Sequence, residues 1–305
     1  MITEMPLHSM RDRILLLRSL HSFAGLDDEG LKLVAEHARS RLFRAGETLL
    51  TEGRTPEHVY IVVSGQLRST RKGKLLAVVT RPRGAGFLSM NARDENGVHV
   101  VADEDTQTLE IPVDALTSAL EENFSLVRNT LRVSAGALVR KRGHLPASPD
   151  RPPPLVLGDY RSEPRTMVEL LLEQRSVGIF SFANIDALIA VARKTLEVRA
   201  EPGEMFWNIG EPSSSWLRID HGRIRCTSAD GKVVDVARNF SLGNLDALAG
   251  EPRSYSARAE TRVIAFRTEL EPFLAVLESH FDLARALIAV LSKAILETPD
   301  PDART

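Results

Sequence analysis

Apolar and polar residues change their period along the chain, and the change divides it into helical and strand-like stretches. Residues 11–41 carry apolar side chains at helical spacing, with an acidic helix start at Asp27. From Leu42 the period becomes that of β-strands, and it returns to helical spacing over residues 112–143. The pattern therefore predicts helices, a strand-rich region and further helices in the first half.

The same order of elements returns in the second half of the chain. Four glycines of the first half recur in the second at one offset, 157 residues, and the matched pairs are Gly46 and Gly203, Gly53 and Gly210, Gly65 and Gly222, and Gly86 and Gly243. Glycine at such points fits turns that need positive φ or a close approach of two chain segments. We expect two copies of one mainly β domain with flanking helices, each an antiparallel, jelly-roll-like β-barrel of short strands.

The repeat divides the chain into a first domain at 1–144, a linker at 145–165 and a second domain at 166–305. The linker is rich in proline, which favours a stiff spacer over a polyproline-type ligand. A wide apolar stripe in the last predicted helix must cover its own barrel, meet another chain, or do both.

One stretch of the second copy, from Leu242 to Ala259, has the residues of an anion site. Gly243 starts a short turn, Leu245 can lie on one face of a helical turn, and Arg253 follows a Gly-Glu-Pro breaker. Free backbone N–H groups at the start of a helix, beside a guanidinium, suit phosphate above all.

This stretch resembles the phosphate-binding cassette of cyclic nucleotide-binding domains, of the catabolite-activator and protein kinase A regulatory-subunit type. The family's glycine, leucines, Arg-Ser pair and final Arg-Ala are matched in this sequence by Gly243, Leu245, Leu248, Arg253, Ser254, Arg258 and Ala259. Asn244 stands at the family's glutamate, and Tyr255 stands at its small residue. The resemblance implies that the arginine pairs with the cyclic phosphate and that the glutamate position accepts from the ribose 2′-hydroxyl.

These departures leave two interpretations of the second cassette open. Arg253 and Ser254 could hold a phosphate, with Asn244 still offering an amide oxygen. Alternatively, Tyr255 fills the pocket and Arg253 pairs with an acidic neighbour such as Glu251 or Asp246.

The first copy departs further, because Phe87 stands at the glutamate position after Gly86 and Asn96 stands at the arginine position. An aromatic ring in place of the carboxylate, without an arginine opposite, cannot hold a desolvated phosphate. We expect an apolar or filled pocket and a degenerate cassette in the first domain.

Composition narrows the remaining classes of function. The chain has 305 residues, a net charge of −2 and one cysteine, which fits a cytoplasmic protein and does not indicate a nucleic-acid or membrane partner. We find no leader, apolar span, catalytic motif or paired histidines for a metal, and therefore expect no enzyme, no metal and no cofactor. The few residues after the second copy also argue against a DNA-binding domain.

Two hypotheses follow from the sequence. The first is a non-catalytic regulatory or interaction protein whose nucleotide binding is weakened or lost. The alternative is a signalling sensor that binds cyclic AMP or cyclic GMP through Arg253 and Ser254. The partner under either hypothesis is an unknown protein or a second copy of the chain, joined through the helices.

Overall fold

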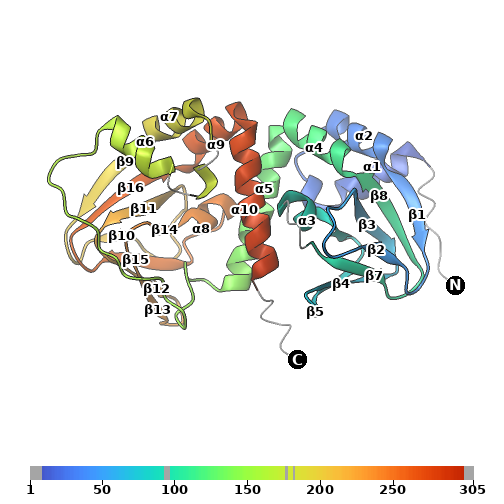
Figure 1. The fold of residues 1–305 in the computed structure, drawn as a ribbon, viewed down its shortest axis with the longest axis horizontal. Coiled ribbons are helices and arrows are strands. Elements are labelled where there is room, and N and C mark those ends of the chain that lie inside the picture. Colours follow the sequence, from blue (N-terminus) through green and yellow to red (C-terminus); the bar gives the residue numbers. More distant parts are fainter. Residues whose placement is uncertain (1–8, 93–96, 176–177, 181–182, 299–305) are drawn as a thin grey trace. The chain divides into compact units, whose positions relative to one another are not determined.

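The computed structural model describes residues 9–92, 97–175, 178–180 and 183–298 (Figure 1). The described chain forms two compact units, one of residues up to 133 together with residues from 288, and one of residues 134–287. The division falls within two helices, α5 (Phe124–Arg142) and α10 (Phe281–Glu297). The domain boundaries at 144 and 166 stay a prediction.

The first unit places helices before and after its strands. Its further helices are α1 (Met10–Arg18), the 3₁₀ turn η1 (His21–Phe23), α2 (Asp28–His37), α3 (Phe87–Ala92) and α4 (Val113–Glu122). Its strands are β1 (Arg39–Phe43), β2 (Thr48–Leu50), β3 (His58–Ser64), β4 (Gln66–Arg71), β5 (Lys74–Thr80), β6 (Gly84–Ala85), β7 (His99–Ala102) and β8 (Thr106–Pro112).

The second unit repeats this order. Its further helices are α6 (Met167–Arg175), the 3₁₀ turn η2 (Gly178–Phe180), α7 (Ile185–Arg193), α8 (Asn244–Ala249) and α9 (Leu270–Ser279). Its strands are β9 (Thr195–Ala200), β10 (Met205–Trp207), β11 (Ser215–His221), β12 (Ile224–Ser228), β13 (Val233–Val236), β14 (Ser241–Leu242), β15 (Tyr255–Ala259) and β16 (Val263–Glu269).

Each unit contains two antiparallel four-stranded sheets, and the order of strands is the same in both units. The orders are β1-β8-β3-β6 and β2-β7-β4-β5 in the first unit, and β9-β16-β11-β14 and β10-β15-β12-β13 in the second. The mainly β fold with flanking helices is therefore confirmed, but the sheets are not closed barrels. The edge strands β6 and β14 have only two residues each, too little backbone for a continuous ladder from one sheet to the other.

Backbone conformation confirms the repeat. The matched glycines all have positive φ, with angles of 85° and 94°, 83° and 85°, 88° and 91°, and 98° and 81° for the pairs that begin at Gly46, Gly53, Gly65 and Gly86. Equivalent helices also start with equivalent caps. Asp27 accepts from the Gly30 N–H at 2.8 Å, and Asn184 accepts from the Ala187 N–H at 2.8 Å.

The glycines differ in what surrounds them, and this gives a paired prediction. A Cβ at Gly222 would overlap the carbonyl oxygen of Arg262, whereas a Cβ at Gly210 would meet nothing within 4 Å. We expect Gly222→Ala to lower the free energy of unfolding by about 2–4 kcal/mol, from conformational strain plus overlap. Gly210→Ala should cost only the strain, about 1–2 kcal/mol. Urea unfolding of both variants measures the difference, and equal costs would contradict the close approach at Gly222.

Part of the predicted linker forms hydrogen bonds with strands and turns of the second unit. The carbonyl oxygen of Val156 accepts from the Arg238 N–H at 3.0 Å, and that of Leu157 accepts from the Gly222 N–H at 2.8 Å. The His221 ring donates to the Gly158 carbonyl at 3.0 Å. We call residues 156–165 the docked segment.

No helix among the described residues is both long and apolar enough to cross a lipid bilayer.

Candidate functional site

The cassette of the second unit is built on a turn whose positive φ favours glycine. Gly243 has a φ of 81° and caps the start of the short helix α8. A Cβ at this position would overlap the Arg253 guanidinium and lie 3.2 Å from the Trp207 ring. The glycine therefore lets an arginine and an indole lie directly against the turn.

Arg253 is 4% exposed and is bound to backbone carbonyls. Its Nη2 donates to the Ser215 carbonyl at 2.7 Å, and its Nη1 donates to the Gly243 carbonyl at 3.3 Å. Its guanidinium carbon lies 4.1 Å from the centre of the Trp207 ring. Burial lowers the pKa of Arg253. Among the residues that the structure describes, Arg253 is hydrogen-bonded to backbone carbonyls and forms no ion pair with Glu251 or Asp246, so this predicted pairing is not found.

Tyr255 contacts both Gly243 and Trp207. Its side chain belongs to the buried core between the two sheets, and the residue is 3% exposed. The phenol oxygen accepts from the Gly243 N–H at 2.6 Å, while the Trp207 indole donates to the Tyr255 carbonyl at 2.9 Å. Burial raises the pKa of Tyr255 well above its usual value, so the phenol stays protonated. The Gly243 N–H at the cassette turn is thus already hydrogen-bonded to the Tyr255 side chain.

Ser254 is bound to α8. Its N–H donates to Asp246 Oδ2 at 3.1 Å, and its hydroxyl lies 2.9 Å from Asp246 Oδ1 and 2.9 Å from the His144 carbonyl. Asp246 is 2% exposed, and burial raises its pKa despite these hydrogen bonds. The hydroxyl of Ser254 is therefore already engaged with acceptors of the protein.

Two residues that the resemblance assigns to one ligand line different cavities. Arg253 and Trp207 line a cavity of about 370 Å³ that also carries Arg199 and Arg267. Asn244 lines a cavity of about 90 Å³ on the side of the helices. Leu245 lies half-buried on α8.

The first unit has an aromatic contact in its cassette. Gly86 has a φ of 98°, and Phe87 starts α3. The Phe87 ring packs edge-on against Phe23, with centroids 6.0 Å apart. Asn96 lies outside the described residues. The ring of Phe87 therefore fills space at the position where the resemblance would put a carboxylate.

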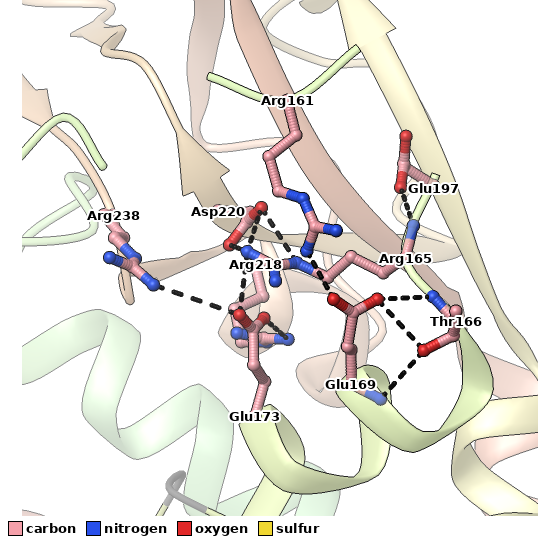
Figure 2. Close-up of polar contacts among 9 residues, drawn as sticks. All are labelled: Arg161, Arg165, Thr166, Glu169, Glu173, Glu197, Arg218, Asp220 and Arg238. Carbon is pink, nitrogen blue, oxygen red and sulfur yellow. Dashed lines mark hydrogen bonds and ion pairs between the residues drawn. The ribbon is translucent and has the colours of Figure 1, made fainter. Parts of the chain in front are cut away.

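Sequence reasoning missed a buried charge cluster in the second unit (Figure 2). Arg165, at the end of the docked segment, donates from Nη2 to Asp220 Oδ1 at 2.7 Å and from Nε to Oδ2 at 3.1 Å, and pairs with Glu173 at 2.8 Å. Arg218 and Asp220 are buried on strand β11, where they alternate with Leu217 and Ile219. Charged residues that alternate with apolar ones in a strand are a signal that buried partners must exist.

Comparison with known proteins was made on sequence and on structure. A family model for the cyclic nucleotide-binding domain matches residues 40–123 and 197–280. The two matches begin and end 157 residues apart, as the glycines do, and together they cover more than half of the chain. They confirm the tandem arrangement.

The curated relatives are longer proteins. Uncharacterized NTE family proteins of Mycobacterium tuberculosis and Mycobacterium bovis are 28% identical over 106 residues, which are 34% of this chain and 18% of theirs. The match thus spans less than a fifth of these relatives.

Among solved structures, the regulatory subunit of a cAMP-independent protein kinase A from Trypanosoma cruzi, bound to guanosine, is 17% identical. The alignment covers 88% of this chain and 83% of that one, with a TM-score of 0.35. The regulatory domain of Toxoplasma gondii protein kinase A with cAMP is also 17% identical, with 93% and 95% covered and a TM-score of 0.35.

Proposed function

Because the chain belongs to the cyclic nucleotide-binding domain family through both of its halves, we propose that it is a non-catalytic regulatory protein whose second cassette is occupied by its own side chains. The main observation in support of this proposal is the hydrogen bond from the Gly243 N–H to the Tyr255 phenol oxygen, inside the core of the unit. This amide is one of the groups that a ligand phosphate would need.

The other cassette groups support the same proposal. Arg253 gives two donors to backbone carbonyls and stacks on Trp207, and Ser254 is bound to Asp246. A cyclic nucleotide whose phosphate used these groups would have to break these contacts and displace a buried ring from the Gly243 N–H. Each displaced hydrogen bond that leaves a buried polar group unpaired costs about 1–3 kcal/mol. We infer that the domains act through a protein partner or a second copy of the chain.

Titration calorimetry with cyclic AMP and cyclic GMP tests this proposal. The unmodified protein should give no binding heat with either nucleotide. Tyr255→Ala removes the ring and frees the Gly243 N–H, so weak binding that depends on Arg253 should appear. The double variant Tyr255→Ala, Arg253→Met is the control and should be silent again. Micromolar binding to the unmodified protein, lost in Arg253→Ala, would overturn the proposal.

One observation favours the second candidate, a nucleotide sensor. The cavity of about 370 Å³ beside Arg253 falls in the range of about 300–1,000 Å³ typical of small-molecule sites. If a nucleotide binds there, removal of Arg253 should cost about 2–5 kcal/mol of binding, since a phosphate would lose its counter-charge. The titration described above separates the two candidates.

A further inference from the structure

A second cavity lies in the same unit, between the sheet β14-β11-β16-β9 and the helices. Its volume is about 90 Å³, and the polar residues of its lining are Gln174, Thr195, Arg218, Ser241, Asn244 and Thr268. The walls between these groups are apolar, and Phe266 and Phe273 are among them. A cavity of this size holds roughly three water volumes, which leaves no room for a nucleoside.

Among the residues that the structure describes, Glu173 alone forms an ion pair with Arg218, and the contact is long. Arg218 is 9% exposed, and its Nη2 lies 3.6 Å from Glu173 Oε2, beyond ordinary hydrogen-bond length. No described residue accepts a hydrogen bond from Arg218 at a shorter distance than this contact. The guanidinium carbon of Arg218 lies 4.9 Å from the centre of the Phe266 ring. A guanidinium carries five N–H donors, and buried donors are nearly always paired.

Arg218 shares its carboxylate partner with two other arginines (Figure 2). Glu173 is shared by Arg165 at 2.8 Å, Arg218 at 3.6 Å and Arg238 at 3.9 Å. Arg165 also holds Asp220. Three guanidinium groups therefore surround two carboxylates, and Arg218 is the one of the three that lines the cavity.

The neighbouring charges pair among themselves. Arg161 pairs with Glu169 at 2.7 Å, and Arg199 pairs with Glu197 at 2.7 Å. Gln174 adds a polar group of its own to the cavity. It is 4% exposed, and its Oε1 is buried without a hydrogen-bond partner among the described residues.

We propose that this cavity binds one small oxyanion of the size of hydrogen phosphate, with Arg218 as its counter-charge. The anion's oxygens accept from the guanidinium, and its hydroxyl can donate to Gln174. Asn244 is the first residue of α8 and lines the cavity, so an occupant would contact the cassette helix from behind. The site is separate from the cavity beside Arg253 and does not depend on nucleotide binding.

Inorganic phosphate, titrated into the full chain against sodium chloride of matched ionic strength, tests the site. We expect a saturable rise of the unfolding temperature and one binding event per chain in calorimetry. Arg218→Met should weaken phosphate binding by at least about tenfold, since a charge-assisted contact is lost. Asn244→Asp should weaken it as well, because the new carboxylate would compete for Arg218.

Two controls locate the site. Arg262→Met removes an arginine that pairs with Glu201 and is not part of the cavity lining, and Arg253→Met removes the arginine of the other cavity. Both should bind phosphate within about threefold of the unmodified protein, a change of less than 1 kcal/mol. If Arg218→Met does not fold, Gln174→Leu keeps the charge and should still weaken binding. A response equal to that of chloride, or loss in Arg253→Met but not in Arg218→Met, would overturn the proposal.

Discussion

Replacement of Arg165 by methionine should lower the free energy of unfolding of the second unit by about 3–5 kcal/mol, because it leaves a buried carboxylate without its partner. Asp220 is 3% exposed, and Arg165 binds both of its oxygens. Although burial disfavours its charge, the hydrogen bond and the charge of Asp220 raise the pKa of Arg165. Urea unfolding followed by tryptophan fluorescence measures the change.

The chain offers a matched control for this prediction. Arg161→Met breaks an ion pair with Glu169 in which both side chains are more than a third exposed, and such pairs contribute about 0–1 kcal/mol. The double variant Arg165→Met, Asp220→Leu removes both buried charges and should recover most of the loss. A cost for Arg165→Met no greater than that for Arg161→Met would show that the cluster does not stabilise the unit.

Tyr255→Ala should cost a similar amount, about 3–5 kcal/mol, because it removes a fully buried aromatic side chain from the core. The ring packs near Trp207, with centroids 6.0 Å apart, and its hydroxyl holds the Gly243 N–H. Tyr255→Phe keeps the ring and removes only the hydroxyl. It should cost about 1–3 kcal/mol, because a buried N–H loses its acceptor.

The difference between these two variants separates packing from the hydrogen bond. Denaturant unfolding of both, with the unmodified protein beside them, gives the two values. If Tyr255→Phe is as stable as the unmodified protein, the Tyr255 hydroxyl does not accept a stabilising hydrogen bond from the Gly243 N–H. The proposal that side chains of the protein occupy the second cassette then loses its main support.

Much of the fold could be predicted from the sequence because local chemistry determines it. The matched glycines mark turns with positive φ, and Asp27 caps its helix through its own side chain. The open sheets could not be predicted, since strand length at an edge depends on which strands pair. The binding of residues 156–165 to the second unit was missed for a related reason. Backbone hydrogen bonds to distant residues leave no periodic pattern.

The candidate site was predicted in part. Sequence reasoning found Gly243, Arg253 and Tyr255 because they keep the spacing of a known cassette. It missed Trp207, whose ring covers the guanidinium of Arg253 from a strand far away in sequence. It also missed Arg218, because nothing local distinguishes a strand arginine that lines a cavity from one in solvent.

The docked segment has a consequence for conformational entropy. Three consecutive prolines, residues 152–154, come just before the first docked carbonyl, that of Val156. Proline fixes φ and favours an extended chain even when nothing holds it. The chain that leads into the docked segment therefore has few conformations to lose when Val156 binds. The prolines thus lower the entropic cost of placing the first docked residue beside the domain that it precedes.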